Sequence, residues 1–147
     1  MSTDNWAQAP PPDLRDRASV AWQWDISRPA QLTAARVQLR RDLADGRLPD
    51  GADADDVDRL LLAFEELASN GVRHSGAPVR VRVTGTTTGW LVDVSDARPD
   101  SPPVPAVDRD PALGGLGLHL IARLSVRHGW FVVGRRKHVW ACLTPAL

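Results

Sequence analysis

One stretch near the middle of the chain constrains the fold more than any other. Its apolar residues recur at the i, i+3, i+4, i+7 spacing of a helix with one buried face. These residues are Val57, Leu60, Leu61, Phe64, Leu67 and Ala68. Acidic residues precede the stretch, where a helix N-terminus favours negative charge, and Ser75-Gly76-Ala77-Pro78 ends it. A helix with such a stripe must be covered by other elements, so the flanking sequence has to supply a second layer.

Five segments are expected to be strands. They span 18–26, 79–83, 90–96, 130–133 and 138–143. In the first three, apolar and polar residues alternate, which is the period of a strand with one buried face. Turns are predicted at Thr86 to Gly89 and at Gly134 to Lys137, so the second and third strands form one hairpin and the last two form another.

Two further helices complete the predicted elements. The first follows Ser27-Arg28-Pro29, with Ser27 as its N-cap, and ends at Asp45-Gly46. The other runs from Leu118 to about Arg127 and ends at His128-Gly129. The order is therefore strand, two helices, two strands, helix, two strands. This order predicts an α+β fold, a two-layer sandwich in which a mixed, mostly antiparallel sheet carries its helices on one face.

Length and composition fit a single folded domain. The chain has 147 residues, 43% of them hydrophobic, which suits one core. Residues 1–17 contain Ala9-Pro10-Pro11-Pro12-Asp13, and because proline fixes φ and lacks a backbone donor, we predict a flexible N-terminal tail there. The domain itself is expected over 18–147.

Charge and cysteine content exclude several classes of protein. Lys plus Arg number 18 and Asp plus Glu number 18, and this balance argues against direct nucleic-acid binding, which usually needs a basic excess. Cys142 is the single cysteine, so the chain cannot form an internal disulfide or a cysteine-based zinc site, and we expect a reducing cytoplasm. No apolar run approaches the ~20 residues that span a bilayer, so no membrane association is expected.

The long central helix carries the first candidate site. Glu66 and Asn70 are four residues apart, so their side chains share one helix face near the border of the apolar stripe. A carboxylate beside a carboxamide oxygen suits Mg²⁺ when phosphates supply further ligands, and a carboxylate can also accept a proton from a hydroxyl. The alternative is a solvated helix face in which Asn70-Gly71 signals the helix end.

Two other candidates follow along the chain. Asp96 ends the apolar face of the third strand, where a carboxylate needs hydrogen-bond donors, such as an adenine amino group. Alternatively, Asp96 caps the turn that follows. Gly114, Gly115 and Gly117 precede a helix, where backbone amides and the helix dipole favour a phosphate. A plain junction between loop and helix is the alternative, and the Lys-Ser/Thr of a P-loop is missing.

Taken together and in this order, the three pieces resemble the ATP-binding domain shared by gyrase, histidine kinases, the large heat-shock chaperone and MutL. The resemblance is closest to the small single-domain branch, the anti-sigma-factor serine/threonine kinases. It covers about Ala18 to Leu143. The matching segments are Phe64-Glu65-Glu66-Leu67-Ala68-Ser69-Asn70-Gly71-Val72-Arg73-His74, Val92-Asp93-Val94-Ser95-Asp96, Gly115-Leu116-Gly117-Leu118 and Lys137-His138-Val139-Trp140.

This resemblance implies a role for each site residue. Asn70 would ligate the Mg²⁺ that bridges the ATP phosphates, Glu66 would act as the catalytic base, and Asp96 would bind the adenine amino group. The remaining nucleotide-binding residues implied are Arg73, His74, Gly115, Gly117 and Leu118. The implied partners are an anti-sigma-factor antagonist and/or a sigma factor, with Arg36 of the first helix facing the partner, and a homodimer is possible.

Departures from the family pattern keep a second function open. The family's Asp-x-Gly-x-Gly reads Asp96-Ala97-Arg98-Pro99-Asp100 here, Leu116 stands where small relatives often carry arginine, and His138 stands where Thr or Ser is usual. The first hypothesis is a kinase that uses ATP and Mg²⁺. The second is a non-catalytic ATP-binding module that holds a partner in bacterial transcriptional regulation.

Overall fold

The computed structural model describes residues 6–14, 20–46, 49, 51–75, 78–100 and 116–145. Its elements follow the predicted order, which confirms the α+β class. They are β1 (Val20–Ile26), α1 (Pro29–Ala44), α2 (Ala54–Ser75), β2 (Val79–Gly85), β3 (Trp90–Asp96), α3 (Leu116–Leu124), β4 (Arg127–Val133) and β5 (Arg136–Leu143). The segment that the sequence predicted as a third helix is therefore shorter, and the strand after it starts earlier.

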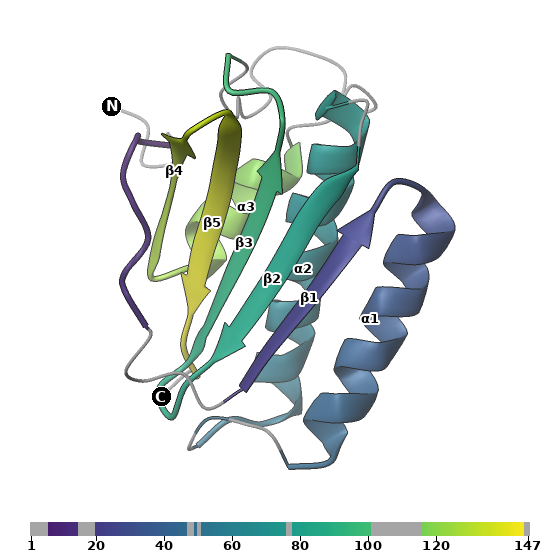
Figure 1. Ribbon diagram of the computed structural model, residues 1–147. Coiled ribbons are helices and arrows are strands. Elements are labelled where there is room, and N and C mark those ends of the chain that lie inside the picture. The colour runs from purple at the N-terminus through teal and green to yellow at the C-terminus, as the bar shows by residue number, and fades with distance from the viewer. Residues whose placement is uncertain are drawn as a thin grey trace.

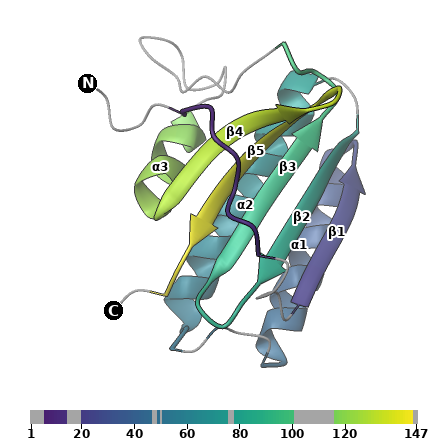
Figure 2. The same cartoon turned by 60° about the vertical axis from the view of Figure 1, so that its left-hand side comes forward.

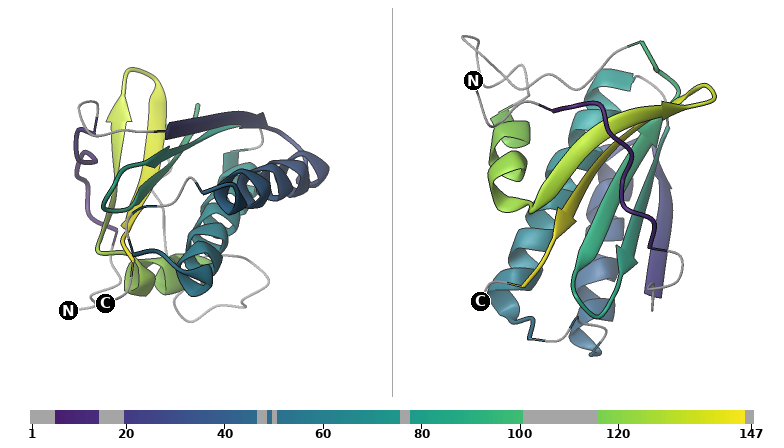
Figure 3. Two further views of the ribbon diagram at one scale, coloured as in Figure 1. Left: turned by 90° about the horizontal axis from the view of Figure 1, so that it is seen from below. Right: turned by 90° about the vertical axis from the view of Figure 1, so that its left-hand side faces the viewer.

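The five strands form one sheet in the order β1-β2-β3-β5-β4, and every neighbouring pair is antiparallel. All three helices lie on the same face of this sheet (Figure 1; Figure 3, left). The core lies between the two layers, where the α2 stripe packs against the inward side chains of the central strands. The strand register makes the helix-facing side of the sheet apolar, because Val81, Val94 and Val139 lie in one row across β2, β3 and β5.

The start of α1 differs from the prediction by one residue. Arg28, rather than Ser27, is the N-cap, and its backbone is extended. Gln31 explains this start, because its side-chain oxygen accepts hydrogen bonds from the backbone N–H groups of Ser27 at 2.8 Å and of Arg28 at 3.1 Å. A helix start leaves such amides without intrahelical partners, so Gln31 satisfies donors near the start of α1.

The end of α3 is corrected more substantially. His128-Gly129 does not end the helix but lies within β4, opposite Ala141 and Trp140 of β5. The helix ends at Leu124, and the Val126 amide then donates to the carbonyl of Cys142 at 2.9 Å. This bond turns the chain directly into the sheet. A glycine before an apolar run favours a helix end in sequence, but here it is a strand residue.

The described part of the N-terminal segment, residues 6–14, is packed rather than extended away as a tail. Gln8 forms a parallel bridge with Trp130, and the Ala9 amide donates to the Trp130 carbonyl at 2.8 Å. Trp6 is buried in the core, and its indole N–H donates to the carbonyl of Leu118 at 3.3 Å. The segment crosses in front of β4 in Figure 2 and Figure 3 (right). Burial of one large aromatic ring explains why this segment packs on the domain, whereas its proline content predicted a flexible tail.

None of the described helices is long and apolar enough to cross a membrane.

Candidate functional site

The end of α2 is held close to the sheet by a residue without a side chain. At Gly71, a Cβ atom would lie 3.0 Å from Val94 Cγ1 and 3.2 Å from Val79 Cγ1, which is tighter than ordinary contact. The helix therefore sits directly on β3 and β2. Glu66 and Asn70, which precede Gly71 on the helix, are both partly buried. Tight packing at Gly71 thus holds the part of α2 that carries these two polar side chains against β2 and β3.

Glu66 meets the first turn of α3. A Cβ atom at Gly117 would lie 2.8 Å from Glu66 Cδ and 3.2 Å from its Cγ, so the Glu66 side chain fills the space that the missing side chain leaves. The first amides of a helix have no intrahelical acceptor and attract negative charge. Two of the three predicted pieces, the Glu-x-x-x-Asn helix and the glycine turn, therefore come together in space at Glu66 and Gly117.

Asp96 points to the helix side of the sheet, as predicted, and is 3% exposed. One carboxylate oxygen accepts a hydrogen bond from the Arg98 amide at 2.7 Å, as expected for a side chain that caps a turn. The other lies 3.4 Å from Lys137 Nζ, and both side chains are almost fully buried. A carboxylate has about four acceptor positions, so these two partners leave capacity for a further donor.

His138 faces the opposite side of the sheet from the candidate site. It is paired with Ser95 in the β3–β5 register, and its Nδ1 lies 3.0 Å from Asp93 Oδ2. Lys137, rather than His138, faces Asp96. The position where the family usually has Thr or Ser therefore contributes nothing to the helix-side site here, and Lys137 is the residue that sequence reasoning missed.

A family model described as a histidine kinase-like ATPase domain matches residues 27–142, which is more than half of the chain. The chain belongs to this family. No curated protein sequence matches the chain. Membership in the histidine kinase-like ATPase domain family indicates ATP as the ligand, and the matched range contains every one of the predicted site residues.

Three of the remaining predicted nucleotide-binding residues of this ATPase domain lie in the described part of the chain, at the end of α2 and at the start of α3. Arg73 and His74 are exposed in the last turns of α2, where cations complement the helix dipole. The Leu118 side chain is buried in the core and its carbonyl accepts from Trp6, so its amide is what it offers a ligand. Gly115 lies outside the described residues.

The donor set of the ATPase domain fits a magnesium ion that is held largely by phosphates. Among the described residues, no group of three or more His, Cys, Asp and Glu is placed to hold a metal by itself. Mg²⁺ keeps several waters and takes one or two protein oxygens plus phosphate oxygens in such sites, so one carboxamide is a suitable protein ligand. The partly buried Asn70, one helical turn beyond Glu66, is the residue that would supply that oxygen.

Proposed function

We propose that this protein is an ATP- and Mg²⁺-dependent serine/threonine kinase of the anti-sigma-factor type. The contact between Glu66 and Gly117 carries the proposal, because it brings a proton acceptor to the helix end that suits phosphate. Asn70 would hold Mg²⁺, which neutralises the phosphate oxygens when it is bound. Asp96 would accept a hydrogen bond from the adenine amino group, alongside Lys137 and the Arg98 amide.

In the transfer itself, Glu66 takes the proton of a serine or threonine hydroxyl on the protein substrate. The hydroxyl oxygen then bonds to the γ-phosphorus, and the bond from that phosphorus to the bridging oxygen of ADP breaks. The backbone amides of Gly117 and Leu118, in the first turn of α3, would stabilise negative charge on the phosphates.

The proposed partner is a small antagonist domain or a sigma factor, and α1 is its proposed docking surface. A shallow hollow on α1 is lined by Arg36, Val37, Arg40 and Arg41, and Val37 is 50% exposed. Arg36 Nε lies 3.3 Å from Glu65 Oε2, and both side chains are about half exposed. An exposed ion pair of this kind is weak, so Arg36 remains accessible to an acidic group on a partner.

Homodimerisation, the other proposed association, would use the β1 edge. β1 and β4 are the outer strands of the sheet, and residues 7–9 already bond to β4. Light scattering of the purified chain at several concentrations tests this, and a constant monomer mass would contradict it.

A neighbouring glutamate makes the kinase test specific. Glu65 is exposed and faces Arg36, whereas Glu66 is partly buried and faces Gly117. With labelled ATP, Mg²⁺ and an antagonist domain, Glu65→Gln should transfer phosphate like the wild type, and Glu66→Gln should lose about 10²–10⁴-fold in rate. Equal transfer by both variants, or none by the wild type, removes the catalytic role.

The second proposal is a regulatory module that binds ATP without turnover. Two observations favour this module. Both glycines of the family's Asp-x-Gly-x-Gly pattern are absent after Asp96, and the buried Lys137 already pairs with the Asp96 carboxylate. A thermal-shift assay separates the two. Saturating ATP and Mg²⁺, at about 100 times the dissociation constant, stabilises a binding protein by about 2.7 kcal/mol. A shift that Asn70→Ala removes, without any transfer, supports the module, and no shift with any adenine nucleotide contradicts both proposals.

A further inference from the structure

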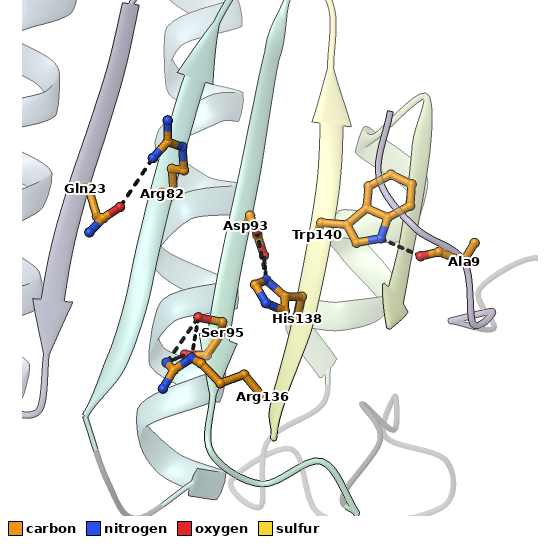
Figure 4. A network of polar contacts seen from close by, with 8 residues as sticks. All are labelled: Ala9, Gln23, Arg82, Asp93, Ser95, Arg136, His138 and Trp140. Atoms are coloured by element: carbon orange, nitrogen blue, oxygen red, sulfur yellow. Dashed lines mark hydrogen bonds and ion pairs between the residues drawn. The ribbon is translucent and has the colours of Figure 1, made fainter. Parts of the chain in front are cut away.

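The face of the sheet opposite the helices has a hollow of about 220 Å³ near the β4–β5 turn. Its polar lining comes from three neighbouring strands. β2 supplies Arg80 and Arg82, β3 supplies Asp93 and Ser95, and β5 supplies Arg136 and His138. Figure 4 shows five of these side chains on β2, β3 and β5. The proposed kinase site does not use any of them, because it lies on the other face.

Ser95 is at the centre of this arrangement. In the register, Arg80 of β2 and His138 of β5 are its two cross-strand neighbours. Arg136 also reaches Ser95, since its guanidinium donates to the Ser95 carbonyl at 3.0 Å and lies 3.1 Å from the hydroxyl oxygen. β2 and β5 lie on either side of β3, and adjacent strands are about 4.8 Å apart, so Arg80 and Arg136 come from strands about 9.6 Å apart and flank Ser95 from opposite sides. Two long arginine side chains can close this gap around one small ligand.

The positive charges of the hollow are only partly compensated. Arg136 is held by the hydroxyl and carbonyl of Ser95, and Arg82 Nη1 lies 3.3 Å from the neutral Gln23 side chain. Arg80 lies 3.4 Å from Asp25, but both side chains are about half or more exposed, so this pair is weak. Asp93 is the single carboxylate among the lining residues, and it is engaged by His138. A guanidinium that is oriented by neutral groups keeps its full charge for a ligand.

We infer that this hollow binds a small phosphate-bearing ligand, either inorganic phosphate or a phosphate monoester. Tetrahedral phosphate offers oxygens in several directions and carries up to two negative charges. It can therefore accept from Arg80 on one side and from Arg136 on the other, in the charge-assisted geometry that guanidinium groups favour. Ser95, a residue that is 3% exposed, lies between them, and its hydroxyl is a further donor.

Size and local charge favour a small anion over an extended one. The hollow is smaller than the roughly 300–1,000 Å³ of sites for drug-sized ligands. Asp25 and Asp93 also interrupt the basic surface on either side, and a nucleic-acid backbone needs a continuous basic track. The occupant is therefore a single phosphate group with little attached to it.

The test is an NMR titration of the full chain at constant ionic strength, with phosphate replacing chloride. The resonances to follow are the Ser95 amide, the side-chain Nε–H groups of Arg80 and Arg136, and the amides of Asn70 and Gly117 as reporters of the ATP site. O-phosphoserine is titrated in parallel with serine. The variants are Arg136→Gln and Arg80→Gln, with Arg127→Gln, which is exposed at the end of β4 away from the hollow, as a charge-matched control.

The inference predicts saturable shifts at Ser95 and Arg136 with phosphate, with O-phosphoserine or with both, and none with serine. Whichever of inorganic phosphate and O-phosphoserine binds more tightly shows whether the site prefers the free anion or a phosphate monoester. Each hollow variant should weaken binding about ten-fold or more, because it removes a charge-assisted hydrogen bond, and Arg127→Gln should leave it unchanged. No saturable shift at Ser95, shifts confined to Asn70 and Gly117, or equal affinity in Arg80→Gln and the wild type would each overturn it. Arg80 is exposed, so its variant remains informative where Arg136→Gln fails to fold.

Discussion

Replacing Gly117 with alanine tests the contact on which the proposed kinase site depends. The new methyl group would lie 2.8 Å from Glu66 Cδ and 3.2 Å from its Cγ. Real Cβ atoms essentially never approach another atom that closely, so something must move. The atoms it meets belong to the end of a flexible side chain, so we expect Glu66 to rotate away while the backbone of α3 stays in place.

The size of the effect follows from two opposing terms. Alanine in place of glycine favours a helix by up to about 1 kcal/mol, and less in a first turn. Moving Glu66 out of its preferred rotamer, or overpacking around it, costs about 1–3 kcal/mol. Gly117→Ala should therefore lower the free energy of unfolding by about 0–3 kcal/mol in the wild type. In a Glu66→Ala background the collision is absent, and the same change should raise it by up to about 1 kcal/mol.

Urea unfolding of the four proteins of this cycle measures the coupling between the two sites. We expect a coupling free energy of about 1–3 kcal/mol, which is the range for residues in contact. A parallel cycle with Glu65→Ala is the control, because Glu65 faces Arg36 and should give additive effects. If Gly117→Ala and Glu66→Ala are additive within about 0.5 kcal/mol, Glu66 does not lie against α3, and the reasoning is refuted.

Three further predictions test other parts of the structure. Lys137→Met should lower the free energy of unfolding in urea by about 3–5 kcal/mol, because it leaves the buried Asp96 carboxylate without its cation, and adding Asp96→Asn should restore part of the loss. Trp6→Ala should lower it by about 3–5 kcal/mol if the N-terminal segment belongs to the core, whereas a loose tail would show almost no change. Burial raises the pKa of the Cys142 thiol, against a smaller opposing effect of Arg127, so a thiol reagent near neutral pH should label the folded chain much more slowly than the urea-unfolded chain. By the same linkage, the unfolded thiol loses its proton first, so stability should fall as pH rises from about 8.5 toward the raised pKa, and Cys142→Ser should lack this decline.

Local patterns were sufficient for most of the fold. The apolar stripe of α2 and the alternation in β2 and β3 each report burial on one face, and burial on one face is what determines a helix or strand of this kind. The same periodicity predicted that Glu66 and Asn70 share a helix face and that Asp96 faces the helices. Each of these predictions depends only on residues within one helix or one strand.

Contacts between distant segments were not predictable in this way. Trp6 lies in a proline-rich stretch with no periodicity, and its burial depends on a space between α3 and β4 that only the assembled sheet creates. The glycine and histidine at the start of β4 likewise favour a helix end by local rules, but pairing with β5 determines their structure. In both cases a tertiary contact overrides local preference.

The start of β5 shows the same limit where it matters most for function. Val139, Ala141 and Leu143 face the helices, whereas Trp140 and Cys142 face the other side, so β5 is apolar on both faces and alternation cannot fix its phase. Trp140 belongs there because its indole N–H donates to the Ala9 carbonyl of the N-terminal segment at 2.8 Å. Pairing with β3 then determines which side chains of β5 face the helices. Lys137 is placed opposite Asp96 on the helix side, and His138 lies on the open face of the sheet. The protein itself therefore compensates the charge of the buried carboxylate, and in the proposed function the adenine amino group would add a hydrogen bond to Asp96 rather than supply its counter-charge.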